Sequence, residues 1–207
     1  MDDSNNQPAV TVSIVDTGVA NLSSAARAFE HLGVNVEIVS TPEQVAKATH
    51  LVLPGVGAFE DGMKGLRSKN LIEPIRAYAA SGRPLFGICL GMQMLFTASE
   101  EFGEWEGLDI IPGRVVKMQS VPENGTSGYK VPLIGWNNLT PPDGKSWEGT
   151  FLQTTKLGAE VYFVHSFFAK PENSDHVLAV EEYGGQIMCA VTKKDNLMGT
   201  QFHPEKS

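Results

Sequence analysis

Hydrophobic and polar positions in the first half of the chain follow two alternating periodicities. Short runs rich in apolar and β-branched residues predict strands, and stretches whose apolar residues recur three or four positions apart predict helices. The predicted strands cover 9–16, 34–39, 51–53 and 84–88, and the predicted helices cover 21–32, 41–48 and 70–80. Continuously apolar strands that alternate with helices are buried on both faces, so the pattern predicts an α/β fold with a largely parallel central sheet flanked by helices.

From Leu108 onward helical spacing becomes scarce, and short strands separated by turns replace it. These strands cover 109–118, 131–136, 161–164, 177–182, 187–191 and 198–202, with a hairpin turn at 183–186. Segments 121–128 and 140–149 contain turn-forming residues and are interpreted as surface loops. We therefore expect extra antiparallel strands in the second half of the chain.

The same pattern bounds the domain organisation. We expect a disordered tail over 1–8 and one domain over 9–207, because 207 residues are enough to bury a substantial single core. The sequence stops at 201–207, directly after a predicted strand, where a helix would be expected to follow and cover the sheet. We therefore expect the final helix of the predicted domain to be missing from this sequence.

Charge and cysteine content narrow the function. The net charge is -8 and no block of Lys and Arg occurs, which argues against nucleic acid or an anionic membrane as the main partner. No apolar run approaches membrane-spanning length, and the polar, acidic start is unlike a secretory signal. The two cysteines, Cys89 and Cys189, imply no disulfide framework. We expect a cytoplasmic protein that acts on a small molecule or on another protein.

Cys89 lies at the centre of Gly-x-Cys-x-Gly in segment 87–91, between a predicted strand and a helix start. This is the layout of a nucleophile elbow, in which glycines permit a sharp turn that exposes the central side chain. A cysteine placed there can attack a carbonyl carbon. The alternative is a buried structural cysteine, which is common for this residue type.

A base and an orienting acid follow another strand. His203 comes directly after an apolar run and has Glu205 two residues further on, so an extended backbone would place both side chains on one side. A carboxylate beside an imidazole fixes its tautomer and stabilises its charged form, as in a catalytic triad. A solvated strand end would explain this pair alone, but the elbow at Cys89 favours the triad. His165 also follows a strand, and both a structural and a chemical role stay open for it.

The oxyanion of an acyl intermediate needs hydrogen bond donors. One candidate is the backbone N–H of Leu90, and the other is the glycine-rich loop 54–57, which contains Gly57; a simple tight turn would also explain this loop. Cys189 has neither a glycine nor an acid beside it and is interpreted as core. No cluster of His, Cys, Asp and Glu has metal-ligand spacing, so we expect no metal and no cofactor.

These segments together resemble the class I, or triad, glutamine amidotransferases, and within them the glutaminase subunits of imidazole glycerol phosphate synthase. The resemblance covers nearly the whole chain. It rests on segments 54–59, 61–63 with Leu66, 87–96, 135–137, 162–166 and 201–207. One departure lies in 16–21, which reads Asp-Thr-Gly-Val-Ala-Asn, whereas relatives often have Asp-Tyr-Gly before the Asn.

The resemblance implies a reaction and its residues. Cys89 attacks the side-chain amide of glutamine, His203 transfers the proton to the leaving ammonia, and Glu205 orients His203. Water then releases glutamate. The residues implied to contact glutamine are Gly57, Leu90, Gln93, Glu101, Ser166 and Phe167, with Gly57 and Leu90 also serving the oxyanion.

The resemblance also implies a partner, a (β/α)8 barrel synthase that receives the ammonia through a tunnel and makes imidazole glycerol phosphate in histidine biosynthesis. The partner forms a heterodimer with the chain or is fused to it. Positions resembling the docking face are Asn21, Ser24, Arg27, Trp136, Tyr162 and Lys206. Three alternatives stay open: an amidotransferase that supplies another synthase, such as one that aminates a surface sugar; a Cys-dependent hydrolase; and a binding module without turnover.

Overall fold

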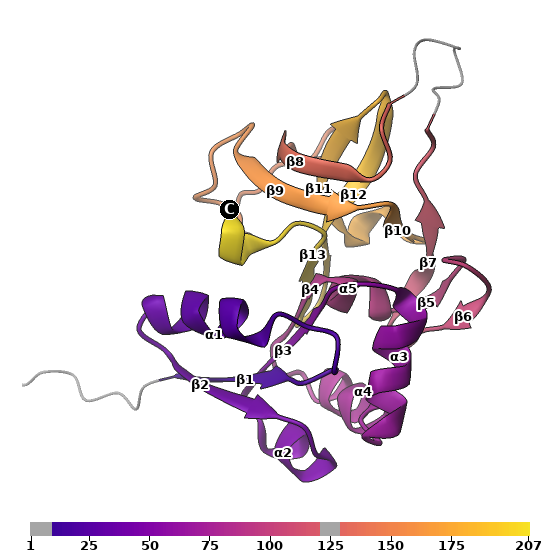
Figure 1. Cartoon of the computed structure of the whole chain (residues 1–207). Coiled ribbons are helices and arrows are strands. Elements are labelled where there is room, and N and C mark those ends of the chain that lie inside the picture. The colour runs from indigo at the N-terminus through magenta and orange to yellow at the C-terminus, as the bar shows by residue number, and fades with distance from the viewer. Residues whose placement is uncertain (1–9, 121–128) are drawn as a thin grey trace, which may run out of the picture.

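A seven-stranded sheet forms the centre of the molecule (Figure 1). The computed structural model describes residues 10–120 and 129–207, so the predicted tail at 1–8 and the predicted loop at 121–128 lie outside the described residues. The strand order is β11-β12-β13-β4-β3-β1-β2. The strands are β1 Thr11–Val15, β2 Asn35–Val39, β3 His50–Gly55, β4 Leu85–Cys89, β11 Val177–Tyr183, β12 Gln186–Lys194 and β13 Leu197–Thr200.

The five strands from β13 to β2 are parallel, as the sequence pattern predicts, and β11 and β12 add an antiparallel edge. Helices connect the parallel strands. They are α1 Leu22–His31, α2 Pro42–Lys47, α3 Phe59–Ser68, α4 Ile72–Ala80 and the short α5 Leu90–Met94.

The pleat of the strands explains why helices cover both faces. On β1, Ile14 packs in one hydrophobic cluster with α1, whereas the next residue, Val15, packs in another with α2, α3 and α4. On β3, Val52 and Leu53 divide in the same way. Since successive side chains point to opposite faces, continuously apolar strands need cover on both sides. The prediction of a parallel sheet flanked by helices is confirmed.

The second half of the chain adds two smaller sheets. One has the order β10-β7-β5-β6, and the other is the two-stranded antiparallel pair β8-β9. These strands are β5 Phe96–Ser99, β6 Trp105–Glu106, β7 Ile111–Lys117, β8 Leu133–Asn138, β9 Glu160–His165 and β10 Phe167–Pro171. Short 3-10 helices cover Ser174–His176 (η1) and Pro204–Lys206 (η2). The predicted hairpin joins β11 to β12 through Gly184 and Gly185, whose φ angles are 65° and 77°.

Helix α3 is absent from the sequence prediction, and its glycines explain why. Gly62 and Gly65 lower the intrinsic helix propensity of the segment. Both are needed for close packing, since a Cβ on Gly65 would overlap the carbonyl oxygen of Thr17, and a Cβ on Gly62 would crowd the side chain of Met94. Tertiary contact therefore outweighs local propensity in α3.

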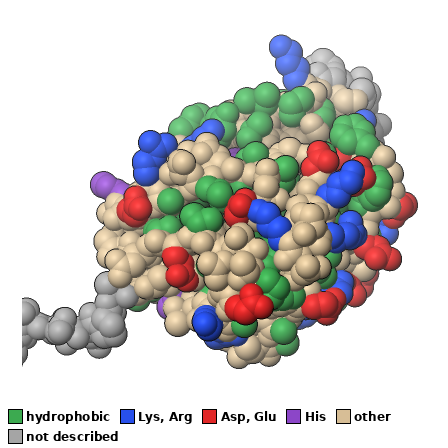
Figure 2. All heavy atoms as spheres, turned by 60° about the horizontal axis from the view of Figure 1, so that its bottom comes forward, with side chains coloured by type: hydrophobic (Ala, Val, Ile, Leu, Met, Phe, Trp, Pro, Cys, Tyr) green, Lys and Arg blue, Asp and Glu red, His purple; other side chains and the backbone are tan. Residues whose placement is uncertain are grey.

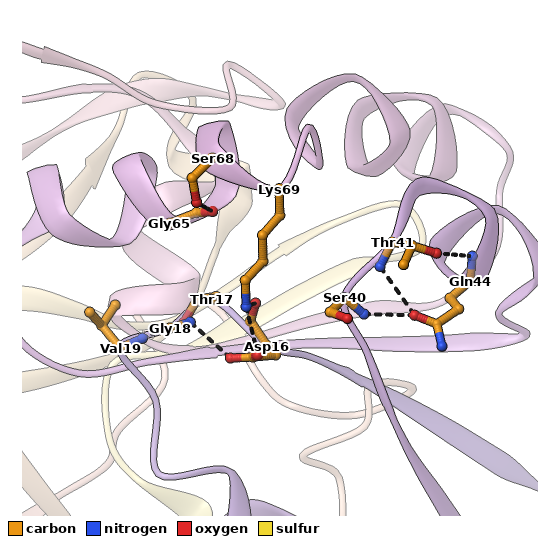
Figure 3. A network of polar contacts seen from close by, with 10 residues as sticks. All are labelled: Asp16, Thr17, Gly18, Val19, Ser40, Thr41, Gln44, Gly65, Ser68 and Lys69. Carbon is orange, nitrogen blue, oxygen red and sulfur yellow. Dashed lines mark hydrogen bonds and ion pairs between the residues drawn. The ribbon is translucent and has the colours of Figure 1, made fainter.

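Polar contacts also fix the loop between β1 and α1, which contains Thr17, to the end of α3 (Figure 3). Lys69 Nζ lies 2.6 Å from Asp16 Oδ2, and the N–H of Gly18 donates to Asp16 Oδ1 at 2.9 Å. The bond from Lys69 lowers the pKa of Asp16, and the Gly18 N–H and the Lys69 charge add to it against the effect of burial. In the same view, Thr41 and Gln44 form the capping box of α2.

The charged side chains are interspersed on the face that Figure 2 shows, where Lys and Arg lie among Asp and Glu. Mixed charge of this kind produces no extended field of one sign on that face. Among residues 10–120 and 129–207, no helix is long and apolar enough to cross a membrane.

Gly65→Ala tests the close approach of α3 to the sheet. Helix propensity alone would stabilise the variant by about 1 kcal/mol. The overlap with Thr17 instead predicts a loss of about 3 kcal/mol in the free energy of unfolding, measured by chemical denaturation. Lys64→Ala, at an exposed position of the same helix, is the control and should stay within about 0.5 kcal/mol. A Gly65→Ala protein as stable as the wild type would contradict the packing argument.

Candidate active site

Cys89 ends strand β4, and helix α5 begins at the next residue. Its φ and ψ are 53° and -111°, a strained region for a residue with a side chain. The glycines on either side allow the turn to be this tight. A Cβ on Gly91 would overlap the carbonyl oxygen of Leu53, and a Cβ on Gly87 would meet the backbone of Met92. The predicted elbow is therefore formed by close packing of α5 on the sheet.

The position of β4 in the sheet brings the other predicted segments to the elbow. β4 lies between β3 and β13, and all three strands are parallel. Their carboxyl ends therefore meet at one edge, which is where ligand chemistry collects in open α/β sheets. The loop after β3 contains Gly57, and the segment after β13 contains His203.

His203 and Glu205 are in direct contact. Nδ1 of His203 lies 2.8 Å from Oε1 of Glu205, and His203 is only 4% exposed. The local geometry differs from the extended backbone of the sequence argument, because Pro204–Lys206 form a 3-10 turn. The two side chains still meet, since the turn brings the carboxylate back towards the ring.

The charge states of this pair depend on each other and on the cysteine. Burial lowers the pKa of His203, but the proximity of Cys89 and the hydrogen bond and charge of Glu205 outweigh it and raise that pKa to about 9. Burial also tends to raise the pKa of Glu205, and His203 with Lys206 brings it below its ordinary value. The raised pKa favours the imidazolium form of His203, which lies against the Glu205 carboxylate and lines the same cavity as Cys89.

A cavity of about 290 Å³ opens beside the elbow. Cys89 and His203 line it, together with all six residues implied to contact glutamine: Gly57, Leu90, Gln93, Glu101, Ser166 and Phe167. Its other lining residues are Val56, Pro132, Val164 and His165. The volume suits a small ligand.

Two of the lining side chains are partly engaged within the protein. Gln93 Nε2 donates to the main-chain oxygen of Phe167 at 2.9 Å and to Gln201 Oε1 at 3.0 Å. Glu101 Oε2 accepts from the N–H of Phe59, the first residue of α3, at 2.7 Å. Burial raises the pKa of Glu101, against the effect of the Phe59 N–H. Because the Nε2 of Gln93 is engaged in these two hydrogen bonds, Gln93 can offer a ligand only its Oε1.

The candidate oxyanion loop is fixed at one end. Gly57 has a φ of 90°, which favours glycine, and the N–H of Val56 donates to the main-chain oxygen of Val19 at 2.8 Å. The Val56 donor is thus engaged outside the cavity. Leu90 follows Cys89 as the first residue of α5, the position expected for an oxyanion donor.

His165 lines the cavity but is tied into the protein on both sides. Its Nδ1 lies 3.0 Å from the main-chain oxygen of Phe167, and its Nε2 lies 2.8 Å from Oε1 of Glu181, which is fully buried. Phe167 O can only accept, so Nδ1 of His165 donates to it, while Nε2 faces the Glu181 carboxylate. This supports the structural reading of His165. Glu181 was missed from sequence, although a glutamate in the apolar run 177–183 is a usable signal.

The second cysteine has a different environment. Cys189 is buried, and its thiol donates to the main-chain oxygen of Val191. Burial, with the nearby Glu181 carboxylate, raises its pKa to about 12. Cys189 is therefore a neutral core residue, as expected. Within the part of the chain that the structure describes, no group of three or more His, Cys, Asp and Glu side chains is placed to hold a metal ion.

The residues implied for docking lie in two groups beside the site. Trp136 and Tyr162 pack edge to face with ring centroids 6.1 Å apart, and Lys206 Nζ lies 5.4 Å from the Tyr162 ring centroid. Asn21 caps α1 by accepting from the N–H of Ser24, and Arg27 Nε donates to a main-chain oxygen of the same helix. Helix α1 contacts η2, which in turn contacts β9 (Figure 1). The two groups therefore border one side of the molecule.

The pKa of His203 predicts how stability depends on pH. A group whose pKa is raised by folding stabilises the protein fully below its ordinary pKa of 6.5 and loses this effect as the pH rises through about 9. The free energy of unfolding of the wild type, relative to His203→Gln, should fall by about 2 kcal/mol across this window in chemical denaturation. A difference that stays constant from pH 6.5 to pH 9 would contradict this account.

Comparison with known proteins shows a consistent set of relatives. The chain is 55% identical over 200 residues to imidazole glycerol phosphate synthase subunit HisH 1 of Legionella pneumophila strain Paris, covering 95% of this chain and 92% of the relative. It is 45% identical over 194 residues to the HisH subunit of Syntrophotalea carbinolica, covering 94% and 92%.

Solved structures and a family model agree with this. A crystal structure described as a glutamine amidotransferase shares the fold with a TM-score of 0.69 at 17% identity, covering 94% of this chain and 90% of that one. A glutamine amidotransferase from Thermotoga maritima has a TM-score of 0.66 at 17% identity, covering 96% and 77%. Residues 13–207 match the family model described as glutamine amidotransferase class-I. The chain therefore belongs to the class-I glutamine amidotransferase family.

Proposed function

We propose that this chain hydrolyses glutamine to glutamate and ammonia and supplies the ammonia to a synthase partner in histidine biosynthesis. The observation that carries the proposal is the arrangement of Cys89 and His203 on one cavity, with Glu205 in contact with the outer side of the His203 ring. Family membership and the HisH relatives support it. The HisH relatives also favour imidazole glycerol phosphate synthesis over the amination of a surface sugar.

The reaction follows from the charges at the elbow. The Cys89 thiolate attacks the side-chain amide carbon of glutamine, and the oxyanion that forms accepts hydrogen bonds from backbone N–H groups, for which Leu90 and Gly57 are the candidates. His203 gives its proton to the amide nitrogen, the C–N bond breaks, and ammonia leaves. A γ-glutamyl thioester remains on Cys89.

The second half-reaction returns the enzyme to its starting state. Neutral His203 takes a proton from water, and the hydroxide attacks the thioester carbon. The C–S bond breaks, glutamate leaves, and Cys89 is again a thiolate beside the His203 imidazolium. Glu205 fixes the orientation of the ring through Nδ1 and stabilises its charged form in both halves.

The rest of the cavity suits the substrate. Glu101 places a carboxylate in the lining, which complements the α-ammonium group of glutamine, although burial disfavours its charge without such a counter-ion. Gln93 presents Oε1, and Ser166 contributes to the lining. These groups, with Phe167, are proposed to select glutamine.

A second feature supports a protein partner. The outer face of β8-β9 carries two cross-strand apolar pairs, Ile134 with Val164 and Trp136 with Tyr162, which we name the ribbon face. Ile134 is 62% and Trp136 is 55% exposed, and Val164 also lines the cavity. Contiguous exposed apolar groups of this kind mark interaction sites. We propose that the ribbon face, with Lys206 and the start of α1 at Asn21, Ser24 and Arg27, docks a (β/α)8 barrel synthase subunit next to the site.

The two cysteines provide a matched test of the nucleophile. Cys89→Ala should lower glutamate release from glutamine by at least about 10⁴-fold, because no thioester can form. Cys189→Ala removes the same atoms from a buried cysteine outside the cavity and should retain most of the activity. Equal activity in the two variants, measured as glutamate release in the presence of the barrel partner, would remove Cys89 from the mechanism.

The ribbon face can be tested by a charge placed at its centre. Ile134→Asp should weaken binding of the barrel synthase at least about tenfold in titration calorimetry, because the charge must be desolvated on docking. It should also reduce the rise in glutaminase rate that the partner causes. Ile187→Asp, at a 64% exposed position on β12 outside this face, is the control.

Unchanged affinity in Ile134→Asp would exclude the ribbon face as the docking surface. A glutaminase rate that no barrel synthase alters would contradict the proposed coupling. Failure to restore growth of a histidine auxotroph would favour a different synthase.

A further inference from the structure

A series of polar contacts runs along the cavity wall and ends at the sulfur of Cys89. Gln93 Nε2 contacts the main-chain oxygen of Phe167 at 2.9 Å and Gln201 Oε1 at 3.0 Å. Gln201 Nε2 then lies 3.7 Å from Cys89 Sγ. Gln93 is 5% exposed and Gln201 is fully buried. The proposed reaction assigns no role to Gln201.

Chemistry dictates the orientation of both amides. A main-chain carbonyl oxygen can only accept, so Gln93 must direct its nitrogen to Phe167 O. That same nitrogen can only donate to an oxygen of Gln201, and the group of Gln201 left facing Cys89 is then its NH₂. Rotation of either amide would place two donors or two acceptors opposite each other and leave buried polar groups unpaired, which is unfavourable.

A donor held on sulfur acts selectively on the thiolate, because a charged acceptor makes the stronger hydrogen bond. We propose that Gln201 is a positioning residue that holds a hydrogen bond donor on the Cys89 sulfur, and that Gln93 orients it. Gln201 is anchored on the sheet, since its backbone N–H donates to Ala190 O at 2.8 Å on the neighbouring strand β12. The inference rests on the proposed function, in which Cys89 acts as a thiolate.

The series of contacts from Gln93 through Gln201 to Cys89 also links the substrate to the nucleophile. Gln93 keeps Oε1 for a ligand in the cavity, while its Nε2 orients Gln201. A glutamine molecule that contacts Gln93 therefore steadies the donor on the sulfur it reacts with. Gln93 should influence the reactivity of Cys89 even when no glutamine is present.

Alkylation of the full-length protein by iodoacetamide tests the proposal without glutamine turnover. The rate at Cys89 is followed by peptide mass spectrometry between about pH 5 and about pH 10, over the ionisation range of thiols. The charged or titratable side chains that contact Cys89 or line its cavity, among the described residues, are His203, Glu101 and His165, with Glu205 behind His203. They are unchanged in every variant, so a shift reports the amide donor.

Gln201→Met keeps the length of the side chain but removes the donor. Alkylation of Cys89 at pH 7 should fall about tenfold, and the midpoint of the pH profile should rise by about one unit, as expected for a lost bond to a charged group. Gln93→Met should cause a smaller change of the same sign. The double variant should match Gln201→Met alone, since both act through one bond.

Thr192→Val is the matched control, because it removes a buried side-chain hydrogen bond from β12 without contact with this series. Its alkylation profile should be that of the wild type. Circular dichroism shows which variants are folded, and if Gln201→Met is not, the Gln93→Met profile decides. A wild-type rate and midpoint in the deciding variant would overturn the inference. Wild-type Cys89 that reacts no faster than Cys189 would instead count against the proposed function itself.

Discussion

The close packing of α5 against the end of β4 is the constraint on which the site depends. Gly87 and Gly91 let the helix approach the sheet so closely that a methyl group at either position would overlap backbone. Cys89 is held between them at a positive φ angle. Because β4 has parallel neighbours on both sides, this turn stands between the loop that holds Gly57 and the segment that holds His203. The fold therefore assembles the site from segments far apart in sequence.

Much of the fold follows from local pattern, and the exceptions have identifiable causes. The alternation of apolar strands and helices, the elbow and the Gly184-Gly185 hairpin are readable because each depends on residues close in sequence. Helix α3 could not be predicted from local pattern, since Gly62 and Gly65 are required by close contacts with Met94 and Thr17, which are distant in sequence. Strands β5, β6 and β10 are short, and β10 pairs with β7, which lies far from it in the sequence.

The candidate site divides in the same way. The predicted pairing of His203 with Glu205 is present in the structure, although a 3-10 turn and not an extended backbone creates it. The buried polar residues that support the site are not predicted by the sequence pattern. Gln201 looks like an ordinary strand-end residue until Gln93 and Phe167 are placed beside it, and Glu181 becomes meaningful only with His165 at 2.8 Å. Such residues act through other side chains, so spacing along the chain does not identify them.

The central claim is that Cys89 carries the acyl group of glutamine. The most direct measurement is acid quenching of the enzyme during turnover with glutamine, followed by mass spectrometry of its peptides. The account predicts a single γ-glutamyl group on Cys89, which builds up when deacylation is slowed and is absent from Cys189. Glutamate release without any glutamyl group on Cys89, or with one on another residue, would contradict it.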